Sequence, residues 1–281
     1  MRRRPVQNLS LKGRDLMSID PNLMKELNDF LPSSTKEKLL NPSAGVIGQG
    51  IAGMLLWVFQ KPLKFGIVKK YEFDKLSISL AEGISKIASE NLTNEKSGLF
   101  FKTLQESIYS MDSDDLRYMF SNLATNTLDK NNVDSISPRF VTILANLSPK
   151  DALFLKKFKK DNILNSSIPS GDLLFKSNTN FALVKKDLVI SEDNNITISV
   201  SEILDNLKSL GILTVEKQTI STRLIPGLSA LEHLAISEYE EEEKKPGLRI
   251  TIGVPDNSKL TFEKSEIRLT ELGKSFLELV L

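Results

Sequence analysis

The feature that most constrains this fold is a run of three helix starts between residues 112 and 160. The first follows Asp112, and the next two lie at Ser137-Pro138 and Ser148-Pro149, eleven residues apart. In the first segment, apolar or small residues recur at steps of three and four, which is typical of a helix with one buried face. These residues are Leu116, Met119, Phe120, Leu123, Ala124, Thr127 and Leu128. We therefore expect a helix packed against a core on one side.

The two Ser-Pro pairs predict where the next two helices begin. A serine hydroxyl can accept a hydrogen bond from a free N–H group of the first turn, and a proline at the first helical position removes no hydrogen bond. After Ser148, Asp151 stands where a capping box has its carboxylate. The block from Asp112 to Lys160 thus predicts three short helices in close succession.

This block resembles the bacterial Abi-alpha family, which is named for abortive infection. In that family an acidic pair precedes a helix with the pattern Asn-Leu-Leu-Ala-Asn-Ala-Met-Asp, and Pro-x-Phe-Val-x-Ile-Leu and Leu-Ser-Pro-x-Asp-Ala follow. The matching residues here are Asp114, Asp115, Asn122, Leu123, Ala124, Asn126, Asp129, Pro138, Phe140, Val141, Ile143, Leu144, Leu147, Ser148, Pro149, Asp151 and Ala152. Thr125 and Thr127 depart from the family, which has small apolar residues there.

The resemblance covers residues 43–160 well and continues more weakly to the C-terminus. It implies a role in defence against bacteriophage and leaves the molecular activity undefined. Most polar residues of the block stand where helix ends need them. Asn122 and Asn126 do not, since they lie one turn apart within the first helix. We therefore expect these two asparagines to make a polar contact elsewhere in the molecule.

Residues 43–59 form a glycine-rich apolar segment without a charged side chain. Ala44, Gly48 and Ala52 share one helical face, and Gly45 and Gly53 lie on a neighbouring face. Small residues at this spacing let helices approach closely, as they often do in membranes. We expect Pro62 and Gly66 to break the helix, and a longer helix to begin near residue 67.

Two interpretations of this segment stay open. In one, it is a buried or self-associating hairpin. In the other, it contacts or enters a membrane, with Trp57 as an interfacial anchor beside Lys61 and Lys64. The run is at the short limit for crossing a bilayer core of about 30 Å. The candidate residues for self-association or membrane contact are Gly45, Gly48, Ala52, Gly53 and Trp57.

The region after residue 160 changes character. Short β-branched runs precede a helix that starts at Ser201 and ends at Gly211, and a strand follows over residues 212–215. A hairpin of residues 248–254 and 260–269 and a final helix capped by Thr270 complete a pattern that resembles a winged helix. The predicted fold class is α+β: a helical N-terminal domain and a winged-helix-like C-terminal domain. The predicted domains are a basic tail with short helices over 1–42, the helical domain over 43–160 and the winged-helix-like domain over 161–281.

Winged helices often bind DNA, so a DNA-binding transcriptional regulator is the alternative function. Its candidate contacts are Lys208, Arg249, Lys264 and Arg268. The candidate recognition helix has only Lys208 as a cation, whereas neutralising phosphates requires several. With a net charge of +1, the whole chain does not favour nucleic acid as a partner.

The composition disfavours most kinds of catalysis. The chain has no cysteine and one histidine, His233. Asp114 and Asp115 are adjacent, so they do not face each other as an acid–base pair. The Gly-x-Gly-x-x-Gly letters at residues 48–53 follow no predicted strand, and a dinucleotide site needs one. We expect no enzyme, no cofactor and no metal site.

The expected partner is another protein or a second copy of the chain, with a membrane surface as a further possibility. No apolar stretch follows Arg2, Arg3 and Arg4, so we do not expect a signal peptide. We expect the protein in the cytoplasm, either free or peripheral to the inner face of the membrane. The expected function is non-enzymatic phage defence through helical self-association, partner binding or membrane contact.

Overall fold

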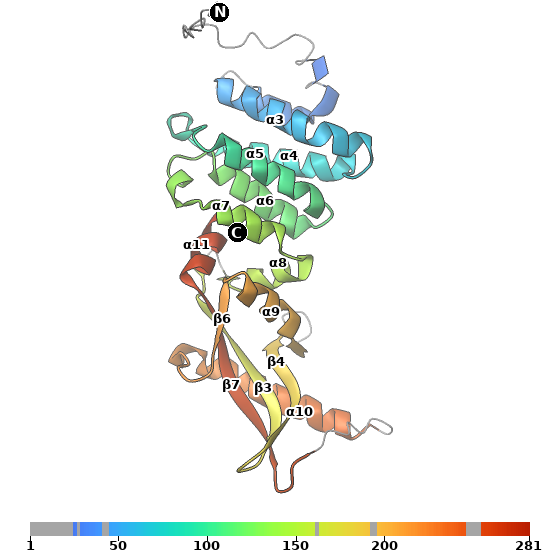
Figure 1. The fold of residues 1–281 in the computed structure, drawn as a ribbon, viewed down its shortest axis with the longest axis vertical. Coiled ribbons are helices and arrows are strands. Elements are labelled where there is room, and N and C mark those ends of the chain that lie inside the picture. Colours follow the sequence, from blue (N-terminus) through green and yellow to red (C-terminus); the bar gives the residue numbers. More distant parts are fainter. Residues whose placement is uncertain (1–24, 27–28, 41–44, 161–162, 192–195, 246–253) are drawn as a thin grey trace, which may run out of the picture.

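The computed structural model describes residues 25–26, 29–40, 45–160, 163–191, 196–245 and 254–281. The molecule is elongated, with stacked helices at one end and a sheet at the other (Figure 1). The basic tail, Arg249 and most of the predicted strand 248–254 lie outside the described residues. The fold is a mixture of helix and sheet, with a helical N-terminal region and a C-terminal antiparallel sheet.

In the helical region α3 lies toward the outer end, α4 and α5 both contact α6, and α7 and α8 lie toward the sheet (Figure 1). Short 3₁₀ turns lie between several of these helices, at Ser89–Asn91, Ile108–Ser110 and Val133–Ser135. The helices are α2 (Ser33–Leu39), α3 (Gly45–Lys64), α4 (Lys70–Ser85), α5 (Ser97–Ser107), α6 (Asp114–Asn126), α7 (Pro138–Ala145) and α8 (Pro149–Lys156). Pro62 lies inside α3, so the expectation that it breaks this helix was wrong.

The three predicted helix starts are confirmed. Ser113, rather than an aspartate, caps α6 and accepts a hydrogen bond from the N–H of Leu116. Ser137 caps α7, and Ser148 forms the expected capping box with Asp151 at the start of α8. All the residues of the predicted buried face, from Leu116 to Leu128, are buried.

The C-terminal region is built on a five-stranded antiparallel sheet in the order β5-β4-β3-β7-β6. Helix α10 crosses this sheet (Figure 1). The strands and helices are β3 (Ser167–Lys176), β4 (Phe181–Ile190), β5 (Thr197–Ser199), α9 (Ser201–Ser209), β6 (Leu213–Glu216), α10 (Ile225–Glu243), β7 (Lys259–Leu269) and α11 (Glu271–Val280), and β1 (Lys159–Lys160) and β2 (Ile163–Leu164) form a separate small hairpin.

The winged-helix prediction is not confirmed. The expected helix, strand and final helix are present as α9, β6 and α11, and Thr270 caps α11 as expected. Ser201 does not cap α9, because Val200 occupies the cap position. The central strand of the sheet is β3, which was not anticipated and pairs with both β4 and β7.

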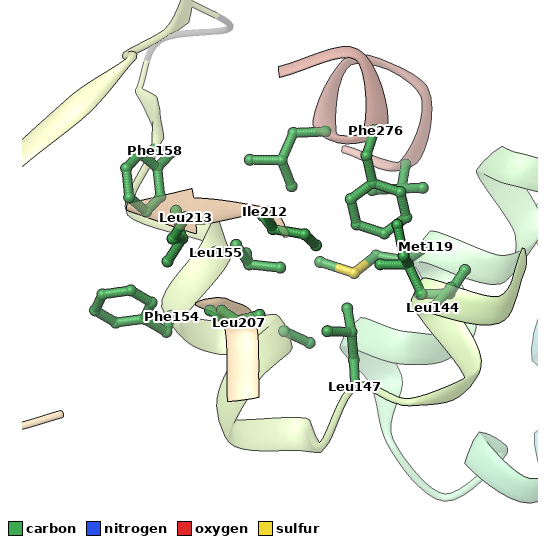
Figure 2. Close-up of a cluster of buried hydrophobic side chains, with 14 of the residues drawn as sticks. Met119, Leu144, Leu147, Phe154, Leu155, Phe158, Leu207, Ile212, Leu213 and Phe276 are labelled. Carbon is green, nitrogen blue, oxygen red and sulfur yellow. The ribbon is translucent and has the colours of Figure 1, made fainter. Parts of the chain in front are cut away.

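One hydrophobic core joins the helical block to the C-terminal region. It contains buried residues of α6, α7 and α8 together with residues of α9, β6, β7 and α11. The members labelled in Figure 2 are Met119, Leu144, Leu147, Phe154, Leu155, Phe158, Leu207, Ile212, Leu213 and Phe276. The predicted domain boundary at residue 160 therefore crosses a shared core. A second core lies among α2–α6, and a third lies between α10 and the sheet.

Candidate interaction surface

The small residues of the glycine-rich segment lie on opposite faces of α3. Gly48 and Ala52, one turn apart, are buried against the chain's own second core. Gly50 and Gly53 face open space, because a Cβ atom added at either position would meet no atom within 4 Å. Gly45 begins α3, and its exposure lies outside the described part of the chain. Close packing of small residues therefore occurs inside the molecule, and a separate set of glycines is left open.

Trp57 continues the open face and is 67% exposed. Its ring packs against Phe101 of α5, with the ring centroids 4.9 Å apart. Trp57 also lines a shallow hollow of about 280 Å³ together with Tyr109, which is 84% exposed. The remaining lining residues are Val58, Gln105, Glu106 and Ile108. This part of the surface is therefore aromatic, with one carboxylate, Glu106, in the hollow.

The end of α3 holds two apolar side chains in solvent. Gly66 has a φ of +69° and follows the last turn of the helix. The N–H of Ile67 donates to the carbonyl of Pro62 at 2.9 Å, and that of Gly66 donates to the carbonyl of Leu63 at 3.1 Å. This is the Schellman pattern, which commonly closes helices with a left-handed glycine. We call residues 65–67 the apolar tip, since Phe65 is 72% exposed and Ile67 is 63% exposed.

The same edge of the molecule is basic. Gly50, Gly53, Trp57, Lys61 and Lys64 lie at steps of three or four along α3, and we call this stripe the outer face of α3. In the part of the chain that the structure describes, Lys61 and Lys64 form no ion pair. Residues 38–71 contain five lysines and no carboxylate, although the chain has 36 acidic residues in 281. The outer face of α3 and the apolar tip therefore lie in a stretch of the sequence that has lysines and no carboxylate.

Glu72 fixes the chain directly after the tip. Its carboxylate is buried and accepts hydrogen bonds from the N–H of Lys69 at 2.9 Å and from the Tyr71 hydroxyl at 3.0 Å. Burial raises the pKa of Glu72, but these two hydrogen bonds and the charge of Lys69 outweigh it, so the pKa lies below its usual value. An anionic Glu72 therefore anchors the first turn of α4 beside the tip.

Within the described residues, no helix is long and apolar enough to cross a bilayer. In the same ranges, no group of three or more histidine, aspartate or glutamate side chains is arranged to hold a metal ion. The Gly-x-Gly-x-x-Gly letters lie inside α3 and not in a turn after a strand.

Asn122 and Asn126 contact the end of the last helix. The side-chain amide of Asn122 donates to the carbonyl of Val280 at 3.1 Å, and that of Asn126 donates to the carbonyl of Leu279 at 2.8 Å. The amide oxygen of Asn126 accepts a hydrogen bond from Asn132 at 2.7 Å. The last carbonyls of a helix lack partners within the helix. The two asparagines thus hold α11 against α6.

The candidate DNA contacts do not form a free cationic face. Lys208 pairs with Asp205 at 3.1 Å, Lys264 with Glu232 at 2.8 Å, and Arg268 with Glu266 at 3.2 Å. Arg249 lies outside the described residues. Phosphate contacts need lysine or arginine charges that are free to neutralise the backbone of the nucleic acid. At all three described positions, a carboxylate within 4 Å already pairs with the cation.

Comparison with known proteins gives one family. A family model described as abortive infection alpha matches residues 68–280. No curated protein and no solved structure matches the chain significantly. The matched range includes α4 to α11 and begins after α3, whereas the expected resemblance began at residue 43. The outer face of α3 and the apolar tip therefore precede the part of the chain that the family model matches.

Proposed function

The chain belongs to the abortive infection alpha family, and from this premise we propose that it is a non-enzymatic phage-defence protein that acts through a binding surface on its outermost helices. The family supports a role in abortive infection. The binding mode is supported by a single observation, the exposure of Trp57 on α3 and of Phe65 and Ile67 directly after this helix. Monomeric proteins rarely expose grouped large apolar side chains without an interaction that uses them.

The proposal assigns separate tasks to the two parts of the molecule. The family-matched part from α4 to α11 forms a continuous support, because its helices and sheet share buried cores. The outer face of α3 makes the contact that protects the cell. Gly50 and Gly53 have no side chains, so that a partner can approach the backbone of α3 at these positions and contact Trp57.

The test is a plaque assay on bacteria that express the protein, with a pair of substitutions at one open position. Gly53→Ala and Gly53→Glu both start from a position where an added Cβ atom meets no atom within 4 Å. We expect Gly53→Ala to protect like the wild type, and Gly53→Glu to lose protection because it places a carboxylate on the contact surface. Thermal unfolding confirms that both variants fold. Full protection by folded Gly53→Glu and by Trp57→Ser would refute the assignment of this surface.

A further inference from the structure

We propose that the apolar tip and the outer face of α3 bind the anionic headgroup surface of a lipid bilayer from one side. The inference rests on the proposed function, because it names the partner of the same surface. It requires no membrane-spanning segment. Peripheral helices bind in this way when apolar side chains reach the headgroup boundary and lysines attract anionic lipid.

The tip supplies the apolar part of the contact. Phe65 and Ile67 flank Gly66 in the sequence and are both exposed, and the Schellman hydrogen bonds fix the turn that carries them. Since these backbone bonds are already formed, little conformational entropy is lost when the side chains enter the headgroup region. The apolar tip is thus already in a fixed backbone conformation before it meets the membrane.

Trp57 adds an exposed aromatic ring about two turns before the end of α3. It lies eight residues before Phe65, which directly follows the last residue of the helix, Lys64. Tryptophan favours the headgroup level because its ring is apolar and its N–H can stay hydrated. Trp57 therefore adds a side chain suited to the headgroup level to the apolar side chains of the tip.

The lysines determine the sign of the partner. Lys61 and Lys64 stand between Trp57 and Phe65 and form no ion pair within the described residues. Lys69 follows the tip and is only partly balanced by Glu72, 3.7 Å away. Lys70 pairs with Asp74. Two or three uncompensated positive charges thus lie beside the apolar side chains, and they complement an anionic surface.

The same charges disfavour a second copy of the chain at this face. A two-fold contact places one patch against itself, so that Lys61 and Lys64 would meet the same lysines of the partner. Like charges brought together without a carboxylate repel each other. An anionic lipid surface avoids this repulsion and also accepts the aromatic side chains.

The experiment is vesicle co-sedimentation of the purified full-length chain. One set of vesicles contains phosphatidylglycerol and phosphatidylcholine in equal parts, and the other contains phosphatidylcholine alone. We expect binding to the first set only, and weaker binding at high salt because salt screens the lysines. Lys61→Glu/Lys64→Glu should weaken binding by about thirtyfold or more, since each lysine near an anionic surface contributes roughly fivefold. Phe65→Ser/Ile67→Ser should also abolish sedimentation.

Matched variants control for charge and for apolar exposure. Lys150→Glu/Lys244→Glu makes the same charge change at exposed positions on α8 and after α10. Phe181→Ser removes a phenylalanine that is 71% exposed at the start of β4, against 72% for Phe65. Both controls should sediment like the wild type. Thermal unfolding shows that each variant folds.

Wild-type protein that ignores phosphatidylglycerol at low salt would overturn the lipid inference, and so would folded tip variants that bind as well as the wild type. If the wild type ignores vesicles while Gly53→Glu abolishes protection, the lipid inference fails and the proposed function stands. If the tip variants lose vesicle binding but protect cells fully, the lipid contact is upheld and its role in defence is refuted.

Discussion

The two ends of the helical region differ in the burial of their apolar side chains. Around α6, α7 and α8, the aromatic and aliphatic residues lie in a core shared with the C-terminal elements. At α3, Trp57, Phe65 and Ile67 remain exposed although the opposite face of the same helix is buried. The region around α6, α7 and α8 is characterised by buried apolar side chains, and the outer edge is characterised by exposed ones. The family match covers the packed region, and the proposed contact lies at the edge outside it.

Substitutions in the shared core should destabilise the fold most strongly. Phe276→Ala removes a fully buried ring that packs edge-on against Phe140, with centroids 5.8 Å apart. The cavity should lower the free energy of unfolding by about 3–5 kcal/mol. Phe65→Ala at the tip should change it by less than about 0.5 kcal/mol. Urea unfolding of both variants measures the contrast, and equal losses would show that the tip is also packed.

Two glycines differ in the same way, since one lies against a buried carbonyl and the other on the open face of α3. In Gly273→Ala, the new Cβ atom would lie 2.3 Å from the carbonyl oxygen of Ile212, so we expect a loss of about 1–3 kcal/mol in unfolding free energy. In Gly53→Ala, the Cβ atom enters open space, and better helix propensity should add about 0.8–1 kcal/mol. Denaturant unfolding should therefore give shifts of opposite sign. A loss at both positions would mean that the outer face of α3 is covered.

The asparagine contacts should have a smaller effect that is confined to one element. Asn122→Ala and Asn126→Ala each remove a hydrogen bond to the end of α11, and each should lower the free energy of unfolding by about 1 kcal/mol. Hydrogen exchange of α11 amides should become faster, while exchange in α4 stays unchanged. Asn131→Ala in the exposed turn after α6 is the control. Unchanged exchange in α11 would show that the two asparagines do not hold this helix against α6.

The smallest effect is expected in acid, at the start of α4. Because the pKa of Glu72 is lower in the folded chain, its carboxylate stabilises the fold above the unfolded pKa of about 4.3. This contribution is lost as the pH falls through the lower, folded pKa. Glu72→Gln should therefore flatten the acid limb of a plot of stability against pH. Exposed Glu90→Gln should leave the limb intact, and an unchanged limb in Glu72→Gln would show that another group causes it.

Local signals made the central helices predictable. Each start depends on a serine or on a serine followed by proline, and the caps act within one turn. The buried face of α6 follows from spacing alone. The partner of Asn122 could not be predicted in this way, because it lies 158 residues further along the chain.

Strand β3 shows where local reasoning fails. Pro169, Gly171 and Asp172 are typical of turns, yet they lie in the central strand of the sheet. Tertiary contacts hold them there: Asp172 accepts hydrogen bonds from Lys217 at 2.7 Å and from the N–H of Asp187 at 2.8 Å. The sheet environment thus overrides the preferences of the individual residues.

The candidate surface was predictable in part. The glycines and Trp57 are evident in the sequence, but their division between two faces depends on which neighbours α3 meets. Phe65 and Ile67 were not anticipated, because Pro62 and Gly66 indicated only a helix end. The absence of carboxylates over residues 38–71 was the available signal for this edge.

The hydrogen bonds from Asn122 and Asn126 to α11 affect how the chain acquires its structure. Helix α6 completes its packing only after residues about 150 positions further on have arrived, as the separations of 158 and 153 residues in its two side-chain hydrogen bonds show. Closing such long loops slows folding. During synthesis, the apolar face of α6 therefore stays partly exposed until α11 has been made and packs against it. A chaperone that binds exposed apolar helices could bind α6 during this time.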